Sequence, residues 1–254
     1  MRRIAAAGAP TLPEATLSEH DGVRYLHLGS VWVQGAMRIR RPRQIELEYV
    51  QRMLAALLWL PDPASGKGRA VQLGLGAGVL TRFTARELGM ATTAVELNPQ
   101  VVAACRRWFA LPAEAEIVVQ DAARWVREAE PASVRLLHVD LYDHEAAAPA
   151  LDDLEFYAAC AALLDDDGVM AVNLFGRRAS FEQSLERLHA ACGAARVWRL
   201  RATREGNTVV VATRSARLPE PACLQRRAEA IEARWGALGL PARKWLRMLR
   251  TTTG

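Results

Sequence analysis

The chain contains 254 residues, of which 51% are hydrophobic, 24% charged and 6% aromatic. This composition is typical of a globular protein with a sizeable core, and it excludes a disordered, collagen-like or membrane-bundle protein. The formal net charge is +5, but residues 214–254 alone carry nine basic and three acidic side chains, so the rest of the chain is close to neutral.

The first predicted unit is a small β-module over residues 1–43. Residues 17–37 alternate polar and apolar side chains around Asp21-Gly22 and Gly29-Ser30, a pattern typical of short antiparallel strands joined by turns. Apolar residues then recur at helical spacing over residues 45–60, and a linker containing Pro and Gly follows at 61–68. We therefore expect a β-module, then a helix that leads into the main domain.

The second predicted unit is an α/β domain over residues 44–216. Apolar strand segments at 70–75, 92–97, 116–120, 135–141 and 169–175 alternate with predicted helices at about 79–88, 99–109, 122–128, 153–164 and 179–192. This alternation predicts a parallel sheet with helices on both faces. Segments 196–201 and 208–214 predict an antiparallel hairpin. The expected fold is a doubly wound, mostly parallel, seven-stranded sheet, which resembles class I S-adenosylmethionine (SAM) dependent methyltransferases.

The third predicted unit is a basic helical tail over residues 217–254. Its apolar residues recur at helical spacing, which indicates amphipathic helices that dock on the body or on a partner subunit. Nucleic acid is the less favoured partner for its positive charge. The four cysteines are widely spaced and the most apolar stretch, residues 53–60, is too short to cross a bilayer. We expect a cytoplasmic protein without a metal or a membrane partner.

A glycine-rich turn follows the first strand of the α/β domain. Gly74, Gly76 and Gly78 stand where the backbone must turn sharply and approach a ligand closely. Glu96 ends the next strand and is placed to accept hydrogen bonds from ribose hydroxyls, with Leu97 beside it. Together these residues predict a nucleoside site.

The third strand ends in a similar way. Asp121 follows it, placed to accept a hydrogen bond from an adenine amino group, with the backbone amide of Ala122 beside it. In the alternative interpretation, Glu96 and Asp121 only cap the helices that follow them.

The fourth strand ends in a group of polar side chains at the same edge of the sheet. Asp140 and Asp143 are three residues apart, with Tyr142 between them and His144 after them. One carboxylate could take a proton from an attacking amine while the other holds a distal ammonium. Asn173 and Phe175 end the fifth strand and could line the acceptor pocket by position.

These features resemble the spermidine synthase (polyamine aminopropyltransferase) family, of which the chain looks like a short, divergent member. The resemblance rests on the β-module with Val33-Gln34, the glycine turn, the acids after strands two and three, and Asp140-x-x-Asp143. It implies that Asp140 is the base, that Gln34 and Tyr49 face the substrate, and that the protein forms a homodimer. The implied donor is decarboxylated SAM, and the implied acceptor is a small amine.

The chain departs from that family at several positions. Ala77 replaces the aspartate that faces the aminopropyl ammonium of the donor, and His144 replaces the proline after the second aspartate. The family's Tyr-(Gln/His)-Glu-Met run has its nearest counterpart in Val50-Gln51-Arg52-Met53, with the only nearby phenol at Tyr49. Two other hypotheses therefore stay open: a SAM-dependent methyltransferase, and a non-catalytic homologue that binds a nucleoside or a nucleic acid.

Overall fold

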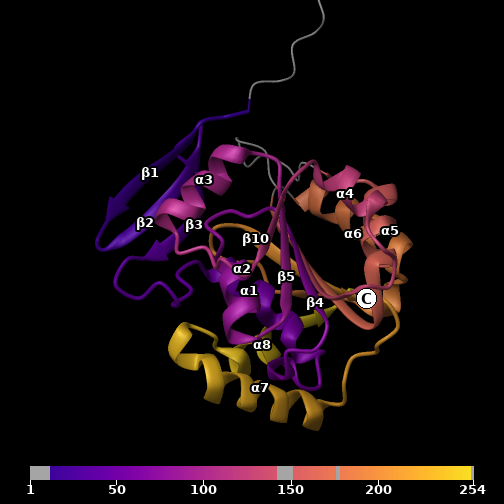
Figure 1. The fold of residues 1–254 in the computed structure, drawn as a ribbon. Helices are drawn as coiled ribbons and strands as arrows, with labels where there is room; N and C mark the ends of the chain where they lie inside the picture. Colours follow the sequence, from indigo (N-terminus) through magenta and orange to yellow (C-terminus); the bar gives the residue numbers. More distant parts are fainter. Residues whose placement is uncertain (1–11, 142–150, 176–177, 253–254) are drawn as a thin grey trace, which may run out of the picture.

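The computed structural model describes residues 12–141, 151–175 and 178–252. A central eight-stranded sheet has the strand order β11-β9-β10-β8-β7-β4-β5-β6, and a separate three-stranded sheet has the order β1-β2-β3. Figure 1 shows the small sheet beside α3, at one end of the α/β body. The expected α/β fold with an N-terminal antiparallel β-module is confirmed.

The central sheet combines five parallel strands with an antiparallel edge. The parallel strands are β4 (Arg69–Leu73), β5 (Ala91–Glu96), β6 (Glu116–Val119), β7 (Val134–Val139) and β8 (Leu164–Phe175). The antiparallel strands are β9 (Val197–Leu200), β10 (Asn207–Thr213) and β11 (Leu249–Thr251). The sheet has one strand more than the seven predicted, because the end of the tail pairs with β9.

Helices cover both faces of this sheet. Buried residues of α1 (Glu48–Met53), α2 (Val79–Arg82), α3 (Pro99–Trp108), α7 (Pro221–Trp235) and α8 (Ala242–Met248) belong to one apolar cluster. Those of α4 (Ala122–Glu128) and α5 (Leu154–Leu163), with residues of α6 (Arg178–Cys192), belong to the other. The doubly wound arrangement follows from strands that are apolar on both sides.

The β-module consists of β1 (Ala15–His20), β2 (Val23–Leu28) and β3 (Val33–Arg38), paired antiparallel. Asp21 and Gly22 join β1 to β2 with φ angles of 49° and 73°, as a two-residue hairpin turn of type I′ requires. The register shift between Leu26 and His27 leaves Gln34 of β3 as the extra residue of a bulge, which bends β3. The module contacts the glycine turn through β3 and the start of α3 through β1, where the Ala15 amide donates to the Gln100 side chain (3.2 Å).

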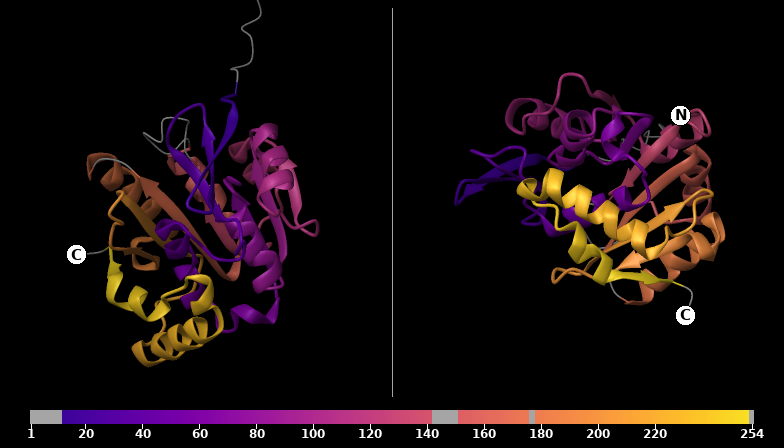
Figure 2. Two further views of the ribbon diagram at one scale, coloured as in Figure 1. Left: turned by 90° about the vertical axis from the view of Figure 1, so that its left-hand side faces the viewer. Right: turned by 90° about the horizontal axis from the view of Figure 1, so that it is seen from below.

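The tail contains α7 and α8, which dock on the body. Leu224, Ala228 and Ile231 of α7 and Trp245 of α8 are buried, and Trp235 meets Phe83 edge to face with ring centroids 5.5 Å apart. Both views in Figure 2 show these helices, in yellow, against the α/β body. In the part of the chain that the structure describes, no helix has the length and apolar character needed to cross a membrane.

Candidate active site

A cavity of about 680 Å³ opens at the carboxyl ends of the parallel strands, between the sheet and the β-module. Its walls come from β2, β3 and the loop between them, from α1, from the ends of β4 to β8, and from the turn between β9 and β10. Open parallel sheets bind ligands at this edge. The volume lies within the range of about 300–1,000 Å³ that is usual for small-molecule sites.

The glycine turn forms the floor of the cavity. Gly74 has φ +92°, and a Cβ atom there would lie 2.2 Å from the backbone oxygen of Asp140. At Gly76 (φ +50°) a Cβ atom would lie 2.9 Å from the backbone oxygen of Gln34. Gly78 (φ +66°) does not line the cavity and instead forms the N-cap of α2. The end of β7 and strand β3 therefore both lie in close contact with the glycine turn.

Strand β3 seals the side of the glycine turn that faces away from the cavity. A Cβ atom at Gly35 would lie 2.5 Å from the Cβ of Ala77, and Ala77 is only 2% exposed. Ala77 is absent from the cavity lining. The position at which the family carries an aspartate thus holds a small apolar contact between the module and the body.

Glu96 lies at one end of the cavity with its carboxylate fixed by backbone amides. Its two oxygens accept hydrogen bonds from the amides of Leu75 (3.0 Å) and Asn98 (2.8 Å). Burial raises the pKa of Glu96, and the backbone hydrogen bonds partly offset that rise. Glu96 does not cap α3, because the Asn98 side chain does so by accepting from the amide of Gln100 (2.9 Å). Each carboxylate oxygen can still accept a further hydrogen bond from a ligand.

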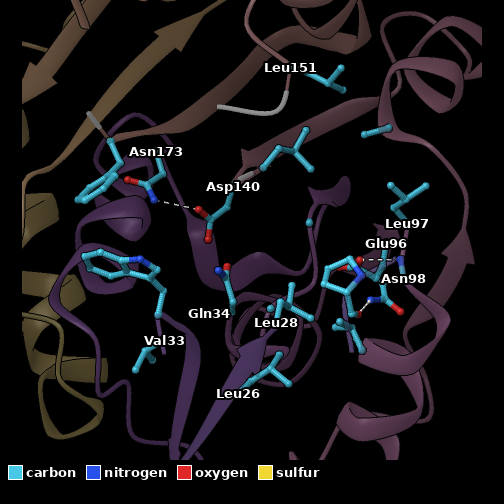
Figure 3. Close-up of a pocket in the computed structure, with 18 of the residues that line it drawn as sticks. Leu26, Leu28, Val33, Gln34, Glu96, Leu97, Asn98, Asp140, Leu151 and Asn173 are labelled. Atoms are coloured by element: carbon cyan, nitrogen blue, oxygen red, sulfur yellow. Dashed lines mark hydrogen bonds between the residues drawn. The ribbon is translucent and has the colours of Figure 1, made fainter. Parts of the chain in front are cut away.

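Asp121 combines the two roles that the sequence left open. Its side chain caps α4 by accepting from the amide of Arg124 (2.9 Å), and it also lines the cavity with Ala122. Leu97 lies on the same wall and is half exposed. Figure 3 shows Glu96, Leu97 and Asn98 grouped on one side of the cavity. Six of the seven predicted nucleoside residues therefore line the cavity: Gly74, Gly76, Glu96, Leu97, Asp121 and Ala122.

Asp140 faces the middle of the cavity and takes part in a chain of side-chain hydrogen bonds. The Asn173 amide donates to its carboxylate (2.9 Å), and the Tyr49 hydroxyl donates a second hydrogen bond. Asn207 in turn donates to the Asn173 side-chain oxygen (3.2 Å). In Figure 3, Asn173 and Asp140 point toward each other, and Gln34 points toward Asp140 from β3. The predicted residues Gln34, Tyr49 and Asp140 are thus brought together.

The electrostatic state of Asp140 follows from these contacts. Burial raises the pKa of its carboxyl, while the hydrogen bonds from Asn173 and Tyr49 lower it because they stabilise the ionised form. A carboxylate whose pKa lies closer to neutral accepts a proton from an amine more readily than an ordinary aspartate does. The arrangement suits a general base.

The Tyr49 contact leads to a prediction about pH dependence. Tyr49→Phe removes a hydrogen bond that favours the ionised carboxylate, so the pKa of Asp140 should rise further above its ordinary value. Because the base works only when ionised, the acid limb of the kcat/KM profile should move to higher pH. A pH–rate series with both proteins measures the shift. Tyr25→Phe, outside the cavity lining, should leave the profile in place; a limb that stays fixed in Tyr49→Phe contradicts the assigned contact.

The departures in α1 have structural roles. Val50 is buried, and Arg52, 5% exposed, donates to the Glu48 carboxylate (2.6 Å) and to the backbone oxygen of Arg201. Neither Val50 nor Arg52 lines the cavity. The phenol of Tyr49, one position earlier, reaches Asp140 instead.

Several residues remain outside this geometry or were missed. Asp143, Tyr142 and His144 lie outside the described residues. Sequence patterns did not single out Trp32, Asn98, Gln120 or Glu205, which all line the cavity. Asn207 pairs with Phe175 across β8 and β10, so the turn between β9 and β10 returns to the active edge. The hairpin predicted from the sequence was therefore the signal that could have placed Glu205 at this edge. No group of three or more potential metal ligands occurs among the described residues.

Comparison with known proteins identifies the family. No protein-family model matches the chain. It is 34% identical over 240 residues to a polyamine aminopropyltransferase of Chromobacterium violaceum, which covers 92% of this chain and 90% of that relative. The chain belongs to the polyamine aminopropyltransferase family. The family resemblance found in the sequence is confirmed.

Solved structures confirm the fold of this polyamine aminopropyltransferase family member. A probable spermidine synthase from Corynebacterium glutamicum matches with a TM-score of 0.72 at 20% identity, covering 94% of this chain and 90% of that one. Human methyltransferase-like protein 13 in complex with SAH matches with a TM-score of 0.63 at 19% identity, covering 74% and 92%. At such identities the likeness establishes the fold alone, and this fold accommodates both aminopropyl and methyl transferases.

Proposed function

We propose that this protein is a transferase that moves the aminopropyl group of decarboxylated SAM to a small amine, as in polyamine biosynthesis. The observation that carries this proposal is the charge of the cavity. Its described lining residues include four carboxylates and no lysine or arginine: Glu96, Asp121, Asp140 and Glu205. A cavity with this charge favours cationic ligands and disfavours the carboxylate that SAM itself carries.

The nucleoside of the donor fits the end of the cavity around Glu96. The ribose hydroxyls would donate to the Glu96 carboxylate, which two backbone amides already orient. Asp121 and the Ala122 amide, at the start of α4, suit the base. Gly74 and Gly76 have no side chain, so the donor can approach the backbone of the glycine turn closely.

The transfer itself needs a neutral, correctly placed nucleophile. The lone pair of the amine nitrogen forms the new bond to the propyl carbon next to sulfur, and the carbon–sulfur bond breaks with its electron pair moving to sulfur. The nitrogen then carries a positive charge, and its proton passes to the Asp140 carboxylate. Asn173 and Tyr49 hold that carboxylate in place, and such positioning adds to the rate.

Two other functions remain as alternatives. Methyl transfer from SAM is favoured by one observation, the replacement of the family's aspartate by Ala77, which removes a partner for the aminopropyl ammonium. Nucleic-acid binding rests on the basic tail, but the apolar side chains of α7 and α8 are used against the body. Because Ala77 carries no charge, Asp140 and Glu205 are the acidic side chains that line the cavity away from Glu96 and Asp121.

Donor choice can be tested by thermal unfolding with each donor. A ligand at 100 times its dissociation constant adds about 2.7 kcal/mol of stability, which corresponds to roughly 5–10 °C in a chain of this size. We expect decarboxylated SAM to give such a shift and SAM at the same concentration to give a clearly smaller one, because the cavity repels its carboxylate.

The Glu96→Gln variant provides the control, since the ribose contact is common to both donors and its loss should reduce both shifts. A shift with SAM that equals or exceeds the shift with decarboxylated SAM would support methyl transfer. If neither donor changes the melting temperature, the transferase proposal is wrong.

We further propose that the protein acts in the cytoplasm as a homodimer, with units at residues 1–43, 44–216 and 217–254. The β-module supports a dimer because β1 is almost wholly exposed and its Leu17 exposes an apolar side chain. Burying such residues against a second copy is favourable. The proposed site includes Asp143, Tyr142 and His144 from the family resemblance, and no metal.

A further inference from the structure

A buried polar cluster lies behind the cavity wall, apart from the groups assigned to the transfer. Its centre is Asp152, whose side chain is 16% exposed. Tyr157 of α5 donates to one oxygen of this carboxylate (2.9 Å), while Ser184 (2.9 Å) and Arg187 (2.5 Å) of α6 donate to the other. Tyr157 and Ser184 are buried. Three donors on two helices therefore hold one carboxylate.

The cluster suits an ionised Asp152. Burial raises the pKa of the Tyr157 phenol, and the charge of Asp152 raises it further, so the phenol stays protonated and donates. Hydrogen bonds to an ionised group are about twice as strong as those between neutral groups. The next residue, Asp153, caps α5 by accepting from the amide of Phe156 (2.7 Å). Two consecutive aspartates thus fix the chain where it enters α5.

Leu151, directly before this cluster, lines the cavity. It is half-buried and packs on the apolar cluster to which α4, α5 and α6 contribute. Figure 3 shows Leu151 on the side of the cavity opposite Leu28 and Val33 of the β-module. Because the Cα atoms of neighbouring residues are only about 3.8 Å apart, a backbone held at Asp152 restricts Leu151. None of the four side chains in the polar cluster lines the cavity itself.

We infer that Asp152 is a positioning residue for ligand binding that acts through Leu151 from outside the cavity. A ligand gains apolar contact with Leu151 only while that side chain stays on the wall. If Asp152 loses its charge, the hydrogen bonds that tie it to α5 and α6 weaken, and Leu151 is held less firmly. This role requires only that the cavity bind a nucleoside, so it does not depend on which donor the protein uses.

The affinity for 5′-methylthioadenosine, measured by calorimetry in the wild type and in Asp152→Asn, tests this role. The ligand is neutral, so the loss of one negative charge does not change its binding directly. We expect Asp152→Asn to weaken the affinity about 2- to 30-fold, the usual range for residues that act through their neighbours. Tyr157→Phe removes one donor and keeps the packing, so it should have a smaller effect in the same direction. It also answers the question if Asp152→Asn does not fold.

Asp165→Asn is the matched control. Asp165 is 24% exposed and accepts from Arg135 (2.9 Å) in an ion pair of the same kind. This pair lies at the opposite edge of the sheet, where β7 and β8 begin. Both substitutions should lower the melting temperature, but Asp152→Asn alone should weaken nucleoside binding. Equal nucleoside affinities in the two variants would mean that Asp152 serves stability alone, which overturns the inference.

A double-mutant cycle tests whether the effect passes through Leu151. Leu151→Ala should weaken nucleoside binding by itself, and adding Asp152→Asn should then reduce the affinity little further, because both changes remove the same contact. Fully additive losses would show that Asp152 acts by another route, so the inference would be wrong while the nucleoside site stands. A wild type that does not bind 5′-methylthioadenosine would overturn both.

Discussion

Replacing Asp140 by Asn is expected to reduce aminopropyl transfer by about 10²- to 10⁴-fold, the usual contribution of a positioned general base. The substitution keeps the size of the side chain and its place between Asn173 and Tyr49, but it removes the group that accepts the proton. Donor affinity should remain close to that of the wild type, because the nucleoside contacts lie at Glu96. Single-turnover rates and calorimetric donor affinities measure the two effects separately.

The shape of the pH profile provides a second reading of this variant. The wild type should lose activity toward acid pH as the Asp140 carboxyl, with its raised pKa, becomes protonated. The residual activity of Asp140→Asn should lack that limb. Asp166→Asn, an exposed acid outside the cavity, should behave as the wild type does. Turnover that is unchanged in Asp140→Asn would mean that another group is the base.

Gly74→Ala is expected to destabilise the protein by about 2–5 kcal/mol. Two costs combine: a left-handed backbone conformation disfavours a side chain by about 1–2 kcal/mol, and crowding in a packed site adds about 1–3 kcal/mol. The crowding is severe here, because the new Cβ would lie 2.2 Å from the backbone oxygen of Asp140. Urea unfolding measures the loss of stability.

Gly22→Ala is the matched control for this substitution. Gly22 also has a positive φ of +73°, but a Cβ atom there has no atom within 4 Å. Its cost should therefore be limited to the backbone term, and transfer kinetics should not change. The difference between the two variants isolates the contact between the glycine turn and the end of β7. Equal stabilities for Gly74→Ala and Gly22→Ala would show that this contact is not tight.

The nucleoside end was accessible from sequence because its residues follow consecutive parallel strands. Strands with the same direction end at the same edge, so Glu96, Asp121 and Asp140 were expected to converge, and all three line one cavity. Glycines mark the turn because the chain reverses there in close contact with the backbone of other segments. Gly78 shows the limit of this reasoning: it has the expected conformation but serves α2 instead of the cavity.

The opposite end of the cavity depends on contacts between segments that are distant in the chain. Trp32 meets Phe175, Gly35 covers Ala77, and Glu205 returns to the site through a hairpin whose register is fixed by pairing with β8. None of these pairs has a characteristic spacing, because side-chain periodicity describes an element and not its partner. The eighth strand is a similar case, since Leu249–Thr251 gains its backbone partners only from β9.

The sequence by itself therefore determined the α/β alternation, the β-module, the glycine turn and the strand-end acids, all of which are local patterns or consequences of strand direction. The tertiary structure decided which of these residues reach the cavity, that Tyr49 and Asn173 hold Asp140, and that a carboxylate lies beside the aromatic pair. The physical reason is that burial and hydrogen bonding between remote segments depend on packing, and packing appears only once the chain is folded.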